Sequence, residues 1–217
     1  MNTRTQGYIA KALLAVCMAL PCWGQQSTQR ADEVKVRVAA IPSAIVIYRD
    51  VTGPYDQHPE VFTEMMKYVG ENYRAAGACF GIYPTDPDSV RPSDLHWQVG
   101  VRVVPGSPLG YGNRVPVEQI PAASDRQLEA TMQKMKQPAA PYKLMILEET
   151  NAAHVESTVA SAGRDGLAMF PWMAKNGYVQ VAPTRMEFQS HEGSPTEMKV
   201  TIIVPMKERA SGLRLSK

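Results

Sequence analysis

Residues 177–190 read GYVQVAPTRMEFQS, which predicts a short strand, a break at Pro183 and then a second strand. Strands favour β-branched and aromatic residues, whereas glutamate is disfavoured in them. Side chains alternate along a strand, so Glu187 should lie on the face opposite to Met186 and Phe188. Alternation alone favours an exposed polar face for Glu187; the other interpretation is a single charge inside a pocket.

The stretch has a counterpart earlier in the chain. AGACFGIY at 76–83 aligns with VAPTRMEF at 181–188, which makes Ile82 the counterpart of Glu187. The predicted order of elements around both segments is strand, helix, strand, loop and strand, at a constant spacing along the chain. We therefore predict two repeats, at about 34–105 and 113–206, with a helical insertion at about 122–140.

The predicted elements define the fold class. We predict strands over 34–49, 79–83, 97–103, 115–120, 142–149 and 200–204, and helices over 59–77, 124–137 and 154–174. Two such units each have an apolar sheet face and one long helix, so pairing them about a pseudo-twofold axis covers the sheet. The prediction is an α+β fold of duplicated β-α-β-β units with an antiparallel sheet, two long helices and a cleft between the halves.

The first 24 residues have the layout of a secretory signal peptide. Arg4 and Lys11 precede an apolar run from Ala12 to Leu20, which is too short to span a bilayer. We expect an exported chain, periplasmic or secreted, with a loose lead at 25–33, a domain at 34–207 and a tail at 208–217. A lipid anchor on Cys22 is a weaker alternative, because Pro21 does not fit a small-residue lipoprotein site.

Charge and cysteine content exclude several function classes. Residues 1–24 hold two of the 23 basic residues and none of the 21 acidic ones, so the rest of the chain is electrically balanced. No basic run or helix-turn-helix pattern indicates a nucleic-acid partner. Cys79 alone remains beyond the signal peptide, which excludes an internal disulfide. The four histidines are isolated in sequence, so we expect no metal and no other cofactor.

Three segments together resemble a known family. VTGPYDQHPEVFTEMMKYV at 51–69, FGIYPTDPDSVRPSDLHWQVGVRV at 80–103 and NGYVQVAPTRMEF at 176–188 are similar to the GyrI-like domain. This is the effector-binding domain of bacterial multidrug-sensing transcription activators, which is related to the SOUL fold. The resemblance covers roughly residues 36–206, and it includes no DNA-binding domain, so the regulator role is not carried over.

The resemblance implies a cleft that binds amphipathic, often cationic, small molecules. It places Glu187 as the pocket acid, Tyr83, Trp172 and Phe188 as walls, Tyr55 at the rim, and Ile82 at the position equivalent to Glu187. A cationic ligand would then compensate a carboxylate that is costly to bury alone. The segment EETNAAH at 148–154 departs from the family, where a turn resembling Gly-Pro-Tyr is common.

Three alternatives to ligand binding remain open. Some proteins similar in fold hydrolyse reactive cyclopropane-bearing compounds with a pocket glutamate, so Glu187 could act as the general acid or base of a hydrolase. A haem carrier of the SOUL type would need an axial ligand, and no histidine of this chain is singled out for that role. A module that binds another envelope protein through the 122–140 insertion is the third, although its partner is unknown.

Overall fold

The computed structural model describes residues 34–85, 89–189 and 197–209. The predicted signal peptide, the lead at 25–33 and most of the predicted tail lie outside the described residues. The helices and strands are β1 (Arg37–Ile41), β2 (Ala44–Thr52), α2 (His58–Asn72), β3 (Arg74–Tyr83), β4 (His96–Val104), α3 (Asp125–Met132), β5 (Lys143–Leu147), β6 (Thr150–Thr158), α4 (Ala162–Lys175), β7 (Tyr178–Gln180), β8 (Thr184–Phe188) and β9 (Lys199–Glu208). The fold is therefore α+β, as predicted.

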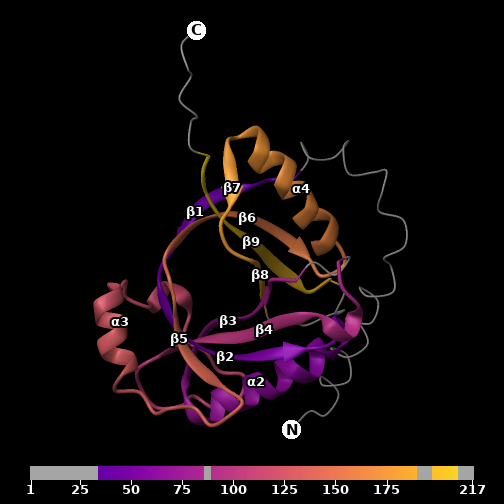
Figure 1. Cartoon of the computed structure of the whole chain (residues 1–217). Coiled ribbons are helices and arrows are strands. Elements are labelled where there is room, and N and C mark those ends of the chain that lie inside the picture. Colours follow the sequence, from indigo (N-terminus) through magenta and orange to yellow (C-terminus); the bar gives the residue numbers. More distant parts are fainter. Residues whose placement is uncertain (1–33, 86–88, 190–196, 210–217) are drawn as a thin grey trace.

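The strands form one curled antiparallel sheet in the order β1-β6-β9-β8-β3-β4-β2-β5, with β7 paired to β9 (Figure 1). Strands β1 and β2 are one long strand interrupted at Pro42, and β5 and β6 are a second one interrupted at Glu148 and Glu149. The pairing of β1 with β6 continues in the same register into that of β2 with β5. At the two breaks the Glu149 amide donates a 2.8 Å hydrogen bond to Ser43 Oγ. This bond connects the two ends of the strand order, β1–β6 and β2–β5.

The repeat predicted from the sequence is visible in the strand register. Strands β3 and β8 lie side by side at the centre of the sheet, with Gly81 opposite Met186. Phe80 pairs with Glu187, and Ile82 pairs with Arg185, symmetrically about that central pair. A twofold axis through this pair would relate Ile82 to Glu187, so the register is compatible with the alignment of 76–83 with 181–188.

Helices α2 and α4 both lie on the outer face of the curled sheet, one over each repeat (Figure 1). Helix α2 presents Val61, Met65 and Val69 to a core built from alternate residues of β2 and β4. Helix α4 presents Met169 and Met173 to the equivalent residues of β6 and β9. Burial of these apolar side chains supplies the main stabilisation of each repeat.

The opposite, inner face of the sheet is also largely buried, because the sheet curls around it. It carries Ile41, Ala152 and Ile203 as a small apolar cluster. By register it also carries Arg102 and Arg185, which are 8% and 5% exposed. Apolar and polar residues alternate in the strand predicted at 97–103, a pattern typical of one solvated face, and the curvature explains why both faces of β4 are buried instead.

The predicted helix at 154–174 is wrong in its first part. Residues 150–158 form strand β6, and α4 begins only at Ala162. Ala153 and Val155 lie on the outer face and His154 and Glu156 on the inner one, a period of two that identifies a strand. The contacts of β6 with β1 and β9 select this conformation, which single-sequence periodicity did not reveal.

Two further boundaries differ from the predictions. Helix α2 ends at Asn72, and β3 begins at Arg74 rather than at residue 79, because pairing with β4 overrides the local helical pattern. The predicted strand at 115–120 is wrong, since Val115 makes one bridge to Ala76 and a 3₁₀ turn follows at Val117–Gln119. The insertion does hold a helix, α3, which begins at a Ser124 capping box.

None of the helices formed by the described residues has both the length and the apolar character needed to cross a bilayer.

Candidate functional site

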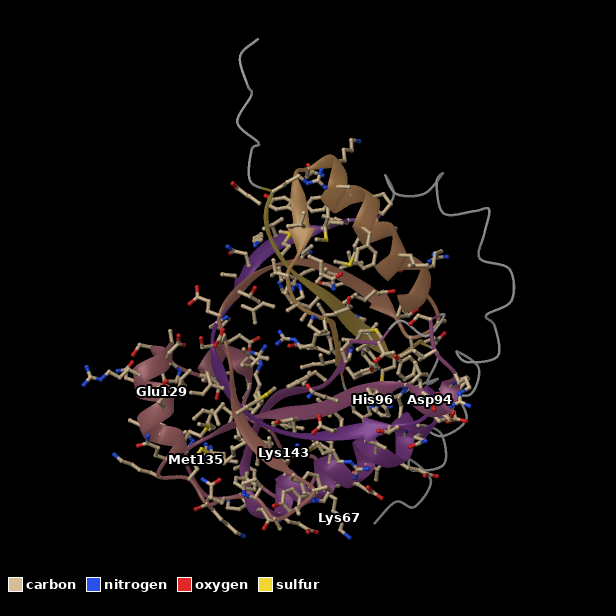
Figure 2. The ribbon with its side chains drawn as sticks, viewed as in Figure 1. Lys67, Asp94, His96, Glu129, Met135 and Lys143 are labelled. Atoms are coloured by element: carbon tan, nitrogen blue, oxygen red, sulfur yellow. The ribbon has the colours of Figure 1, made fainter. Side chains whose placement is uncertain are left out.

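Six aromatic rings meet on the outer face of the sheet, where the two repeats join. They come from α2, from the turn directly before α2, and from strands β3, β4 and β8. We call them the aromatic cluster, and its members are Tyr55, His58, Phe62, Tyr83, Trp97 and Phe188. His58 lies 4.3 Å from Trp97 between ring centroids, and Phe62 lies 4.9 Å from Phe188. The aromatic cluster lies near the start of β4, which is marked in Figure 2 by the labels of His96 and of Asp94 just before the strand.

The turn before α2 holds the rim of the aromatic cluster. Gly53 adopts φ 122°, a conformation that favours glycine, and its carbonyl accepts a 3.2 Å hydrogen bond from Trp97 Nε1. The Tyr55 hydroxyl donates to the Thr85 carbonyl over 3.2 Å. These bonds connect the turn to β4 and to the end of β3, so the position of Tyr55 is defined by both.

The buried His58 and the partly buried Tyr83 are hydrogen-bond partners at the centre of the aromatic cluster. His58 Nε2 and the Tyr83 hydroxyl are 3.1 Å apart, and His58 is only 4% exposed. Burial lowers the pKa of His58 to about 4, so the imidazole is neutral at physiological pH. Burial likewise raises the pKa of Tyr83 well above its usual value. The Tyr83 ring lies over Gly81, where a Cβ would meet the Tyr83 hydroxyl and ring.

The remaining members of the aromatic cluster are only partly covered. Tyr55, Phe62 and Phe188 are of intermediate exposure, around the buried Trp97 and His58. Partly exposed rings of this kind offer flat faces that bind apolar groups and attract cations. The aromatic cluster can therefore accept a ligand at its surface, whereas its centre is packed.

A second group of functional side chains lies on the inner face. Arg102 Nη2 donates a 3.0 Å hydrogen bond to Glu187 Oε1, and Arg185 Nη2 lies 3.2 Å from the same oxygen. The Glu187 side chain is 20% exposed. We call Arg102, Arg185 and Glu187 the arginine cluster. A carboxylate held by two guanidinium groups is already compensated for its burial, so it needs no cationic ligand.

Phe80 and Gly100 form the floor beneath the arginine cluster. The guanidinium carbon of Arg185 lies 5.5 Å from the centroid of the Phe80 ring, a cation–π distance. Phe80 in turn lies against Gly100, where a Cβ would come within 2.6 Å of the ring. The missing side chain at Gly100 thus allows Phe80 to lie flat under Arg185.

Three buried nitrogens of this region make no hydrogen bond with the described residues: Arg185 Nε, Arg185 Nη2 and His154 Nε2. The contact of Arg185 Nη2 with Glu187 is an ion pair without hydrogen-bond geometry. Burial lowers the pKa of Arg185 to about 10; Glu187 opposes this shift and Arg102 adds to it. Burial also lowers the pKa of His154, whereas the Glu187 charge acts in the opposite direction. His154 therefore lies within the electrostatic field of the arginine cluster.

A cavity of about 820 Å³ opens at the β1–β6 edge of the sheet, beside the first turn of α4. Its apolar lining includes Val34, Ala39, Val155 and Ala168. Its ionisable lining residues are Lys35, Arg37, His154, Glu156, Arg164 and Asp165. The volume lies within the range of small-molecule sites.

The structure brings only some of the predicted site residues together. Tyr55, Tyr83 and Phe188 meet in the aromatic cluster, where Tyr55 and Tyr83 lie 5.3 Å apart between ring centroids. Glu187 and Ile82 lie on the opposite face of the sheet, because both follow the alternation set by the β3–β8 register. Glu187 therefore does not share a wall with Phe188.

Trp172 is separate from both groups. It belongs to α4 and stacks on Tyr178, with 6.0 Å between the ring centroids. Both rings pack against the core formed by α4, β6 and β9. The structure therefore does not bring Glu187, Tyr83 and Trp172 together in one pocket.

Sequence reasoning gave no site role to five residues of these two groups: His58, Phe62, Trp97, Arg102 and Arg185. His58 is one of the four histidines isolated in sequence, and it is buried in the aromatic cluster. Arg102 and Arg185 alternate with apolar residues in their strands, a pattern typical of a solvated face. The alternation identified the correct face but not its burial, since curvature of the sheet is a tertiary property.

In the part of the chain that the structure describes, no three His, Cys, Asp or Glu side chains gather closely enough to hold a metal ion. Cys79 is buried, and burial raises the pKa of its thiol.

Comparisons with known proteins show that the fold of this chain is similar to solved structures. No protein-family model matches the chain, and no curated protein matches it. Among solved structures, the C-terminal domain of EcmrR is similar at a TM-score of 0.59 and 12% identity, covering 81% of this chain and 98% of that domain. EcmrR in a complex with DNA is similar at a TM-score of 0.61 and 10% identity, covering 94% of this chain and 68% of EcmrR. The chain therefore shares the fold of the EcmrR C-terminal domain, a fold compatible with the GyrI-like domain that its sequence resembles.

Proposed function

We propose that this chain is an exported GyrI-like domain that binds a small amphipathic molecule on the aromatic cluster. The observation that carries the proposal is the set of partly exposed rings, Tyr55, Phe62, Tyr83 and Phe188, at the junction of the two repeats. The resemblance of the sequence to ligand-binding effector domains, and the shared fold, support the same conclusion.

A positive charge on the ligand would be held by ring faces rather than by Glu187. The faces of tyrosine, tryptophan and phenylalanine attract cations within about 6 Å of the ring centroid. Glu187 lies on the other face of the sheet and is engaged by two arginines. A cationic, apolar ligand therefore fits the aromatic cluster through ring contacts and through burial of its apolar groups.

Replacing Phe62 by alanine should weaken binding of a lipophilic cation by about tenfold. The substitution removes a ring that contacts His58, Trp97 and Phe188, so both apolar area and a cation-binding face are lost. The measurement is a ligand-observed NMR titration with benzyltrimethylammonium and with its neutral isostere neopentylbenzene. The cation should bind more tightly than the isostere.

Trp172→Ala is the matched control, because it removes an aromatic residue of α4 that lies outside the aromatic cluster. Its affinity for the cation should equal that of the parent protein. Equal losses in the two variants, or no cation binding by the parent, would refute the aromatic cluster as the ligand site.

Export is the part of the proposal that rests on residues 1–24 alone. A fusion of residues 1–33 to alkaline phosphatase, which is active only after export, should be active in a bacterial host. Deleting the apolar run 12–20 should abolish that activity while the fusion protein is still made. An inactive full fusion present at normal abundance would show that the segment is not a signal peptide.

A further inference from the structure

We propose a second binding site, on the inner face, for a small molecule that carries a carboxylate or phosphate group held by Arg185 and His154. This site is separated from the aromatic cluster by the thickness of the sheet, since its residues occupy the alternate positions of β6 and β8. It is therefore independent of the proposed function and can be tested separately.

The first argument is the charge of the arginine cluster. Arg102 and Arg185 are both more than nine-tenths buried, and Glu187 supplies only one negative charge between them. One positive charge thus remains uncompensated in a region of low dielectric constant, an arrangement that is costly unless an anion lies beside it. A cation at this position would increase the imbalance, whereas a monoanion would remove it.

The second argument is the identity of the donors that lack an acceptor. Arg185 Nε and Nη2 belong to the same edge of the guanidinium group. Neither makes a hydrogen bond with the described residues, although Nη2 lies 3.2 Å from Glu187 Oε1 in an ion pair. This edge presents two parallel N–H groups, the geometry that binds carboxylate and phosphate in a bidentate manner. A third buried nitrogen without a hydrogen-bond partner among the described residues, His154 Nε2, lies on the same inner face, across Ile203 from Arg185. An anion beside His154 would favour the imidazolium form, in which Nε2 donates.

The third argument is access from the cavity at the β1–β6 edge. His154 and Thr201 both line that cavity, and Thr201 lies directly opposite Glu187 in the β8–β9 pairing. The cavity therefore extends to within one strand of Arg185. An anionic group at Arg185 and His154 would leave the rest of its molecule in a space of about 820 Å³ with a partly apolar lining.

The charges of the cavity itself favour the same sign of ligand. Glu156 is paired with Arg37 at 3.3 Å, and Asp165 is paired with Arg164 at 2.9 Å. Lys35 is the additional cation of the lining. Both the cavity and the arginine cluster therefore carry an excess of positive charge, which attracts anions and disfavours cations.

The test is isothermal titration calorimetry of the purified protein with four probes of equal chain length: hexanoate, hexyl phosphate, hexanol and hexylammonium. We expect hexanoate or hexyl phosphate to bind, and the other two probes to bind at least about tenfold more weakly. The stronger of the two anions identifies the preferred group. Equal binding of hexanol would show that the cavity accepts only apolar chains, and no binding of either anion would overturn the proposal.

Two substitutions at the site should act in opposite directions. Arg185→Gln should weaken anion binding by at least about tenfold, because it removes the bidentate donor. Glu187→Gln should strengthen it by about threefold or more, because it removes the carboxylate that repels the anion. Arg126→Gln, which removes an exposed charge on α3, should leave binding unchanged. A weaker anion affinity in Glu187→Gln would contradict the proposed charge balance.

A measurement on the unsubstituted protein keeps the test independent of folding defects. In the parent protein, hexanoate should shift the side-chain Nε–H resonance of Arg185 and the imidazole resonances of His154 in nitrogen-15 NMR spectra. His154→Gln should weaken binding several-fold, whereas Phe62→Ala should not affect it. Shifts confined to the aromatic cluster would place the anion on the outer face and refute the inner site.

Discussion

Replacing Glu187 by leucine should lower the free energy of unfolding by about 3 kcal/mol. Removal of one partner from a buried ion pair typically costs about 3–5 kcal/mol, because the remaining charge stays buried without compensation. We expect the lower end of that range, since the Glu187 side chain is 20% exposed and water can partly solvate Arg102. The measurement is urea denaturation, with the midpoint and the slope determined separately.

The matched control removes the whole arginine cluster. The triple variant Arg102→Met, Arg185→Met, Glu187→Leu should recover most of the loss, because a well-packed apolar group of similar volume has no desolvation penalty. A Glu187→Leu protein within about 1 kcal/mol of the parent would show that the two guanidinium groups do not depend on this carboxylate. A triple variant less stable than Glu187→Leu would show that the cluster stabilises the fold as a unit.

Acidification should destabilise the protein by about 3 kcal/mol between pH 6.5 and pH 4 through His58. Burial lowers the pKa of His58 to about 4, below the ordinary value of 6.5, so the unfolded chain takes up its proton first. Stability from the neutral imidazole is complete above pH 6.5 and is lost as the pH falls to about 4. Each pKa unit corresponds to about 1.4 kcal/mol, which sets the size of the effect.

His58→Gln tests the assignment, because glutamine can still bond the Tyr83 hydroxyl but does not titrate. The difference in unfolding free energy between pH 7 and pH 4 should be smaller in this variant by about 3 kcal/mol. His154, whose pKa burial also lowers, should contribute in the same direction and remains in both proteins. The control His96→Gln, at an exposed histidine, should keep the pH dependence of the parent.

The strongest sequence predictions concerned elements with a clear period. The alternation of Trp97, Val99, Val101 and Val103 correctly indicated β4, and the helix predicted over 124–137 contains α3, which follows the Ser124 capping box. The alignment of 76–83 with 181–188 is compatible with the register of β3 and β8. These predictions succeeded because local periodicity and local capping decide such elements with little help from distant contacts.

The errors arose where distant strands decide the local structure. Residues 150–158 are a strand only because β1 and β9 pair with them on both sides. Residues 74–78 join β3 for the same reason, through pairing with β4 and a bulge at Ala76–Cys79. No local pattern in these stretches is strong enough to outweigh a helical interpretation.

For the candidate site, the sequence by itself determined the faces: Met186 and Phe188 on one side of β8, and Arg185 and Glu187 on the other, because side chains alternate along any strand. Only the tertiary structure decided what each face becomes. The curled sheet buries the inner face and brings Arg102 from β4 to Glu187 across β3, while α2 brings His58 and Phe62 to Phe188 on the outer face. The physical reason is that alternation is a property of one strand, whereas burial and ion pairing depend on the curvature of the whole sheet and on contacts between residues far apart in the chain.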